Sequence, residues 1–544
     1  MIPALFILGV CVVVFAISIH SKIRYIKNLK AEIAHSFGKK PGEKENNLES
    51  IGRYAGHAAK HDLRIDSITW NDLGMDNIFK RINSCHCSVG EEYLYNCLHE
   101  PQFCEKPLLK REELIKFYET NPKKRFDAQF ILARLGISNY NGIPALIYKP
   151  EAKQLPRPRL YIALAILPLL FAASLIVSLP VGIAGLILSF IANVITHYWA
   201  IKRVDSELFT IDYFISMMKC LKKLYAIEGL SKLPVMQELR TSYAVFSKIV
   251  RKTPVTKSTM GADVNEGMRI YANIAFLIDV RRYNKFMKLI ARHNHEFHQI
   301  YRAIGEMDAA QAILSFRMSL PISSTPLFRD INVLDFEEIY HPLVEDCVTN
   351  SRVLTKNSLI TGANATGKST FIKALAINGI LAQTIYTCAA KQFATRPAMV
   401  MTSMAMRDDL LGGESYFVVE VKSLKRILDM VVKHPCICYI DEILRGTNTV
   451  ERIAASTAIL THLSKQDVLC IVASHDIELT RLLSHIHENY HFSEQINDDG
   501  IIFDYKLKIG PTETRNAIKL LEFMGFDNQI VQNANEIANN QGGI

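Results

Sequence analysis

Residues 362–370 read Gly-Ala-Asn-Ala-Thr-Gly-Lys-Ser-Thr, which is the pattern of a phosphate-binding loop. The two glycines allow a tight turn in which successive backbone N–H groups face the phosphates. Lys368 is expected to reach the β- and γ-phosphates, and the Ser369 hydroxyl to bind Mg²⁺. An apolar run at 358–360 precedes the loop and a helical stretch at 371–380 follows it. The sequence therefore predicts a nucleoside triphosphate site made by Gly362, Asn364, Gly367, Lys368, Ser369 and Thr370.

An acidic pair follows a second apolar run. Residues 436–440 read as a short buried strand that ends at Asp441 and Glu442. Asp441 is expected to hold Mg²⁺, and Glu442 to polarise the attacking water, because phosphoryl transfer depends mainly on positioning and charge neutralisation. A third apolar run, 468–473, leads to His475 at the carboxyl end of a strand, where open parallel sheets bind their ligands. We interpret His475 as a sensor of the γ-phosphate; an ordinary polar strand end is the alternative.

These motifs belong to a longer series, which runs through 361–370, Asp408-Asp409-Leu410 with 413–420, 441–449 and Ser474-His475. In this order the series resembles the ATPase domain of the MutS family of DNA mismatch-repair proteins. In that family, as in related ABC-type ATPases, the Ser-x-Phe-x-x-Glu segment opens a helix that meets the γ-phosphate held by the other subunit. The resemblance implies that Ser415 acts in trans, that the active unit is a homodimer, and that ATP and Mg²⁺ are the cofactors.

Four positions depart from the family pattern. Ala363 and Thr366 replace the usual Pro and Gly of the loop without removing a phosphate ligand. Leu444 stands where the family usually has Gly, and Asp476 stands where an aromatic residue is common. These four departures are expected to affect communication between the ATP sites of the dimer more than ATP hydrolysis itself.

The resemblance covers roughly residues 65–540. Residues 83–117 resemble the start of the family's helical core, 304–316 the end of its lever helices, 340–344 the strand entering the ATPase, and 505–538 the dimerisation tail. A counterpart of the mismatch-reading domain is missing, and Phe117-Tyr118-Glu119, which imitates its Phe-x-Glu wedge, is expected to be a helix face. The resemblance therefore implies binding to DNA structures rather than to single mismatches.

Three apolar stretches predict membrane spans. Residues 2–19 are long enough to cross a bilayer, and basic residues follow them at once. A cleaved signal peptide is the alternative, but its positive charge would precede the run. Residues 160–200 are nearly uncharged and are interrupted at 179–182, as in a hairpin of two spans; a buried hairpin in a soluble core is the alternative. Basic residues flank all three spans on one side, which places 21–159 and 201–544 in the cytoplasm of a multi-pass cell-membrane protein.

The net charge of +9 is unevenly distributed, since basic residues exceed acidic ones over 1–320 and acidic residues exceed basic ones over 321–544. Clusters such as Arg281-Arg282 with Lys285 fit either nucleic-acid phosphates or anionic lipid, and the sequence leaves both open. Eleven cysteines without framework spacing indicate a reducing compartment, and the Cys85-His86-Cys87 spacing does not favour zinc.

Together these patterns predict an anchor at 1–20, a linker at 21–65, and a helical core and lever at 66–320 that the hairpin at 160–200 interrupts. An α/β P-loop ATPase domain with an ABC-like, mostly parallel sheet is predicted at 321–510, and a helical dimerisation tail at 511–544. The function favoured is that of a membrane-anchored, MutS-like ATPase that binds DNA as a dimeric clamp in repair or recombination. A membrane-associated ABC-type ATPase that acts in transport or another membrane process without nucleic acid is the alternative.

Overall fold

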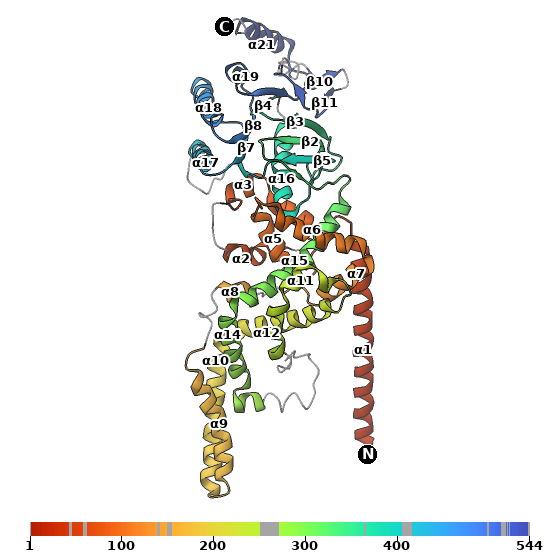
Figure 1. Cartoon of the computed structure of the whole chain (residues 1–544), viewed down its shortest axis with the longest axis vertical. Coiled ribbons are helices and arrows are strands. Elements are labelled where there is room, and N and C mark those ends of the chain that lie inside the picture. Colours follow the sequence, from red (N-terminus) through yellow and green to blue (C-terminus); the bar gives the residue numbers. More distant parts are fainter. Residues whose placement is uncertain are drawn as a thin grey trace.

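The strands all lie toward one end of the long axis of the molecule, and the described segments at the other end are helical (Figure 1). An α/β part lies at one end, a helical body lies in the middle, and two helical extensions leave the body at the other end. The computed structural model describes residues 2–42, 46–57, 63–138, 142–148, 155–250, 271–363, 366–404, 416–497, 500–512, 518, 521 and 523–541.

The helical part comprises α1 (Ile2–Ser36), α2 (Leu48–His57), α3 (Ser67–Asp72), α4 (Met75–Ile82), α5 (Ser88–His99), α6 (Glu105–Thr120), α7 (Pro122–Ala133), α8 (Ile143–Tyr148), α9 (Pro158–Ser174), α10 (Leu179–Tyr225), α11 (Pro234–Glu238), α12 (Arg240–Val250), α14 (Ile278–Arg292) and α15 (Asn294–Ser319). The predicted linker at 21–65 is largely helical, because α1 runs through the expected boundary at residue 20 and α2 packs on α5 through Ile51 and Tyr54. The Phe-x-Glu sequence at 117–119 lies on α6, as expected for a helix face, and Tyr118 is buried.

The α/β part comprises β1 (Leu327–Phe328), β2 (Leu334–Ile339), β3 (Asn350–Leu354), β4 (Ser358–Thr361), α16 (Lys368–Ile385), β5 (Gln392–Thr395), β6 (Met399–Met404), α17 (Tyr416–Val431), β7 (Cys436–Asp441), α18 (Thr449–Leu463), β8 (Val468–Ala473), α19 (Ile477–Leu482), β9 (Glu488–His491), β10 (Glu494–Asn497), β11 (Gly500–Phe503), β12 (Lys508–Ile509) and α21 (Asn528–Gln541).

The larger sheet has the strand order β12-β9-β4-β8-β7-β6 and is parallel except at β12. Its strands are buried on both faces: Cys436, Cys438 and Ile440 of β7 pack with α17 and α18, whereas Ile437 and Tyr439 pack with the core that contains α16. A smaller, mixed sheet of order β1-β5-β2-β3 was not predicted. The strand expected at 340–344 ends earlier, since β2 stops at Ile339.

A buried carboxylate joins α15 to α5 in the helical body. Asp308 accepts hydrogen bonds from the backbone N–H groups of His86 and Cys87, at 3.0 and 2.9 Å to Oδ2, and from the Cys87 thiol at 3.0 Å. A Cβ on Gly90 would lie 2.2 Å from Asp308 Oδ2, so only glycine allows this approach. The contact brings together the two segments around 83–90 and 304–308 that the sequence singled out. Among the described residues, no group of three metal-ligating side chains is found.

The two extensions, α1 and the hairpin of α9 and α10, point in the same direction from the helical body (Figure 1). The hairpin is tightly packed, because a Cβ on Gly182 or Gly185 would lie within 2.4 Å of Leu175 or Phe171 on the facing side. Asn193 Nδ2 donates to the carbonyl oxygens of Leu164 at 3.0 Å and Ala275 at 2.6 Å.

Most large apolar side chains of the hairpin are exposed, so the described part of this chain does not bury the hairpin in its own core. Among the described residues, Leu179–Val204 is the one helical stretch whose length and composition suffice to cross a bilayer, and it is 22% buried. Pro158–Ser174 is apolar but shorter. The side chains of residues 2–15, which carry most of the first predicted span, lie outside the described part of α1.

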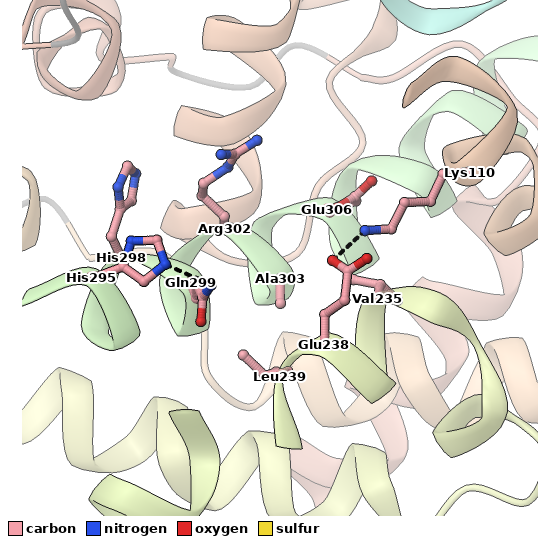
Figure 2. A pocket seen from close by; sticks show the side chains of 10 residues that line it. All are labelled: Lys110, Val235, Glu238, Leu239, His295, His298, Gln299, Arg302, Ala303 and Glu306. Atoms are coloured by element: carbon pink, nitrogen blue, oxygen red, sulfur yellow. Dashed lines mark hydrogen bonds and ion pairs between the residues drawn. The ribbon is translucent and has the colours of Figure 1, made fainter. Parts of the chain in front are cut away.

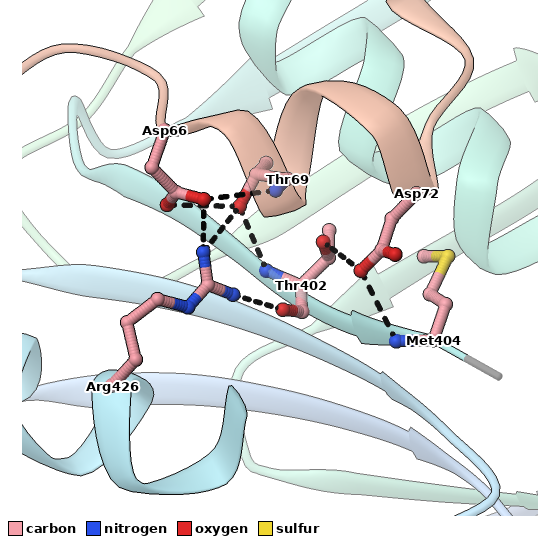
Figure 3. Close-up of polar contacts among 6 residues, drawn as sticks. All are labelled: Asp66, Thr69, Asp72, Thr402, Met404 and Arg426. Carbon is pink, nitrogen blue, oxygen red and sulfur yellow. Dashed lines mark hydrogen bonds and ion pairs between the residues drawn. The ribbon is translucent and has the colours of Figure 1, made fainter. Parts of the chain in front are cut away.

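Short helix α3 fastens the helical part to β6, an edge strand of the larger sheet (Figure 3). Asp72 Oδ2 accepts hydrogen bonds from the Thr402 hydroxyl at 2.6 Å and from the Met404 N–H at 3.2 Å. The Thr402 N–H donates to Thr69 Oγ1 at 3.3 Å, and Arg426 of α17 pairs with Asp66. Burial raises the pKa of Asp72 above its usual value, although both hydrogen bonds oppose that rise.

We predict that Asp72→Ala destabilises the protein by about 1–3 kcal/mol, because it leaves two buried donors without an acceptor. Asp72→Asn keeps an acceptor and should cost little. Since the folded-state pKa of Asp72 is raised, its contribution to stability is full below the unfolded pKa and is lost as pH rises through the folded pKa. Thermal unfolding of both variants between pH 4 and 8 tests this, with the exposed Asp127→Ala as the control. Equal melting temperatures for the Ala and Asn variants would contradict the assignment.

Candidate functional site

The strand order brings the predicted site residues to one edge of the larger sheet. Strand β8 lies between β4 and β7, and all three are parallel. The loop that begins at Gly362 follows β4, Asp441 ends β7, and His475 follows β8. The carboxyl ends of three adjacent strands therefore present the loop, the acidic pair and the histidine to the same space.

The loop has the backbone geometry that its glycines allow. Gly362 and Gly367 have φ of 145° and 97°, in the region that disfavours a side chain, and a Cβ on Gly362 would lie 2.6 Å from the Phe492 carbonyl oxygen. Lys368 begins α16, and its Nζ donates to the carbonyl oxygens of Gly362 and Ala363, both at 2.7 Å. Burial lowers the pKa of Lys368, while Asp441 and Glu442 oppose that effect. Asn364 lies outside the described residues.

A cavity of about 510 Å³ opens over the loop. Its wall includes Lys368, Ser369, Thr370 and Glu442 from the predicted site. Five rings that sequence reasoning did not assign to the site also line it, those of Tyr340, His341, Phe371, Phe492 and Tyr505. This volume is in the usual range for small-molecule sites, and a lining that combines charged groups with rings suits a ligand with a charged and an aromatic part.

Asp441 has the features of a cation ligand. The residue is buried, and its Oδ1 has no hydrogen-bond partner among the described residues. A buried carboxylate oxygen without a donor is costly unless a cation or a water binds it. Ser369 lies exposed at the cavity, where its hydroxyl can act as a second oxygen ligand. Oxygen ligands of this kind fit Mg²⁺, which keeps part of its water shell and binds phosphates.

Glu442 stands at the centre of a small ionic network. Its Oε1 lies 2.8 Å from His475 Nε2, and its Oε2 lies 3.0 Å from Arg445. The hydrogen bond from His475 is the largest cause of the lowered pKa of Glu442, so this carboxylate is ionised at neutral pH. An ionised carboxylate beside the cavity can accept a proton from water, and His475 holds it in place.

The backbone after β7 is strained. Glu442 and Leu444 have φ of 59° and 57°, in the left-handed region that costs a non-glycine residue of order 1 kcal/mol. Glu420 of α17 supports this turn, because its Oε1 accepts a hydrogen bond from the Arg445 N–H at 3.2 Å. A Cβ on Gly446 would lie 3.0 Å from Phe417 Cβ, so α17 packs directly on the same turn. The position of Leu444 is one where glycine is the easier residue.

The other departures from the family pattern are accommodated locally. Thr366 is buried and donates its hydroxyl to the Ala363 carbonyl oxygen at 2.8 Å. Asp476 forms a two-pronged ion pair with Arg452 of α18, at 2.8 and 2.6 Å. Ser415, Asp408 and Asp409 lie outside the described residues, and their predicted roles stay predictions.

Residues 358–541 match a family model described as MutS domain V. Mouse (Mus musculus) "MutS protein homolog 4" is 31% identical over 270 residues, which is 46% of this chain and 28% of that protein. "DNA mismatch repair protein MutS" of Natronomonas pharaonis is 27% identical over 272 residues, or 48% of this chain and 31% of the relative. The protein of the same name from Thermotoga maritima is 27% identical over 259 residues, or 46% and 32%. The chain therefore spans about a third or less of the length of these relatives.

Proposed function

The C-terminal part of the chain belongs to the MutS family, and on that premise we propose that the protein binds and hydrolyses ATP with Mg²⁺ in a P-loop fold. The observation that carries the proposal is that Lys368 and the His475-bound Glu442 line one cavity, while the unpaired oxygen of Asp441 belongs to the residue next to Glu442. By family resemblance the working unit is a homodimer to which Ser415 contributes in trans.

Each residue has a distinct task in this reaction. Lys368 leaves the loop carbonyls and binds the β- and γ-phosphates, while the loop N–H groups and the start of α16 bind the remaining oxygens. Ser369 and Asp441 would hold Mg²⁺, which would neutralise charge on the phosphates. Glu442 orients the attacking water and accepts its proton. His475 fixes Glu442 and lies where it can respond to the γ-phosphate. Tyr505, Phe492 and His341 offer ring surfaces to the base.

We predict that Glu442→Gln binds ATP but hydrolyses it at least about 10²-fold more slowly, because the amide keeps the shape and the phosphate ligands while removing the base. Steady-state phosphate release and binding of a fluorescent ATP analogue measure the two properties separately. Glu478→Gln, an exposed carboxylate on α19, is the matched control. Turnover by Glu442→Gln within about threefold of the unmodified protein would exclude Glu442 as the base.

We further propose that the chain is anchored in a membrane by α1 and by the α9–α10 hairpin, with the ATP site in the cytoplasm. Exposed Tyr198 and Trp199 lie one turn before Lys202 and Arg203, which is the order of an aromatic belt followed by cytoplasmic charge. The parallel course of α1 and the hairpin supports insertion of both into one bilayer (Figure 1). The second helix reaches the length of a span, whereas α9 does so only with a locally thinned bilayer or a contribution from residues 175–178.

The topology predicts opposite labelling of the two ends of the hairpin. Val177→Cys, at its exposed tip, should react with a membrane-impermeant maleimide in intact cells. Lys202→Cys, at its base, should react only after the membrane is opened. Labelling of both positions from the same side would contradict a spanning hairpin and would leave the ATPase proposal untouched.

There are two candidates for the macromolecular partner, DNA and an anionic membrane surface. The names of the relatives favour DNA, and we propose binding to branched or duplex DNA as the first candidate. A specific observation favours a membrane process instead: Arg281, Lys285, Lys288 and Arg292 are exposed on one face of α14, which packs against α9 and α10 at the base of the hairpin. Basic residues at the base of the hairpin would be attracted to anionic lipid, and each contributes about 1 kcal/mol of binding free energy near the membrane surface.

Salt titrations of the protein in neutral nanodiscs separate the candidates, because anionic lipid is then absent. If DNA is the partner, affinity falls with salt, and the combined Arg281→Gln and Lys285→Gln changes lower the log–log slope by about 0.9 per lost phosphate contact. Lys356→Gln, exposed in the α/β part, is the control. Two results together would reject DNA in favour of the membrane alternative. These are the absence of DNA binding at low salt and a faster rate of ATP hydrolysis in anionic nanodiscs.

A further inference from the structure

A second set of polar cavities lies in the helical body, away from the proposed ATP site. Two cavities of about 200 and 240 Å³ share four lining residues, which are Lys110, His298, Arg302 and Glu306. Figure 2 shows the outer one, where side chains of α15 face those of α6 and α11. The inner one reaches Arg111 on α6 and Thr384 near the end of α16.

The carboxylates around these cavities are each matched by a cation. Glu238 lies 2.5 Å from Lys110, and Glu100 lies 3.1 Å from Arg64. Glu306 lies 4.0 Å from Arg111. The histidine shared by both cavities adds no charge, because burial lowers the pKa of His298 to about 4 and its Nε2 lies 2.7 Å from the Tyr54 hydroxyl.

Two guanidinium groups are left with unused donors. Arg302 lines both cavities, is accessible within them, and among the described residues has no hydrogen bond or ion pair. Arg111 is buried, and its Nε has no hydrogen-bond partner. A buried donor without an acceptor is costly, and a cation without a partner in a cavity attracts an anion. The cavities thus present the unpaired guanidinium group of Arg302 and the free Nε donor of Arg111.

We propose that these cavities form a binding site for a small phosphate-bearing anion, with Arg302 as the main ligand and Arg111 and Lys110 as supporting ligands. Guanidinium forks bind phosphate oxygens in pairs, which suits an oxyanion better than chloride. The aromatic wall of the inner cavity, formed by Tyr54, Tyr93 and Tyr148, leaves room for an organic group on the phosphate.

The site has a physical connection to α16. Arg111 Nη1 donates to the Thr384 carbonyl oxygen at 2.5 Å, in the last turn of the helix whose first residue is Lys368. An anion that attracts Arg111 competes with this contact and so changes the support of α16. If the proposed ATPase function holds, occupancy of the cavity changes the ATP turnover rate, and this regulatory consequence rests on that function.

Binding is tested by calorimetric titration of inorganic phosphate into the full chain in neutral detergent, at constant ionic strength. The ATP site is first saturated with ADP and Mg²⁺. We expect saturable binding of one phosphate per chain, weakened at least about tenfold in Arg302→Gln. Lys110→Gln, which breaks only a half-exposed ion pair, is the second cavity variant and should also weaken binding. Arg329→Gln, an exposed arginine that follows β1, should bind as the unmodified protein does.

Lys368→Ala separates this site from the proposed ATP site. Phosphate binding that survives Lys368→Ala but not the cavity variants supports the inference, even if the protein proves to hydrolyse no ATP. Phosphate binding that is lost in Lys368→Ala but retained in Arg302→Gln belongs to the phosphate-binding loop and overturns the inference. The absence of saturable binding to the unmodified protein also overturns it.

Discussion

A largely buried ion pair fixes the C-terminal end of α15 to α6. Arg317, near the end of α15, binds both carboxylate oxygens of Glu112 on α6, at 3.0 and 2.7 Å, and donates to the Tyr386 carbonyl oxygen just beyond α16. Because the pair is buried, loss of either partner leaves an uncompensated charge, so the geometry tolerates little movement. A single helix is thereby fixed at one end to the α/β part and continues, through α14, to the base of the apolar hairpin.

Two further contacts fix neighbouring helices to one another. The carboxylate of Asp308 holds α15 to α5, and Arg111 holds α6 to the end of α16. Each contact is short and buried, so these helices have little freedom to shift against one another. The strained turn at Glu442 and Leu444, in the proposed ATP site, is supported from α17 by Glu420 and Phe417 and from the end of β8 by the contact of His475 with Glu442.

Sequence reasoning predicts the strands well where the pattern is local. The strands at 358–361, 436–441 and 468–473 and the loop between the first strand and α16 follow from apolar runs that end at polar residues, and the structure confirms them. The rings of His341, Phe492 and Tyr505 could not be found in this way, because they come from three loops that only the tertiary fold brings to the cavity. The same holds for Arg111 and Arg302, which are far apart in sequence. The linker interpretation of 21–65 gave too little weight to the apolar spacing of α2, whose buried face is visible only once α5 is in place.

The contact of α3 with β6 has a consequence for solubility. Strand β6 lies at the border of the sheet, and an open border is a template on which another chain can add a strand. Thr69 and Asp72 occupy the N–H groups of Thr402 and Met404 that such a strand would use. Side chains of a short helix thus act as a cover that ends the sheet without adding a strand. A chain that lacked residues 1–72 would lose these side chains. The edge of β6 would then be apolar and unpaired, which are the properties of a strand on which aggregation can start.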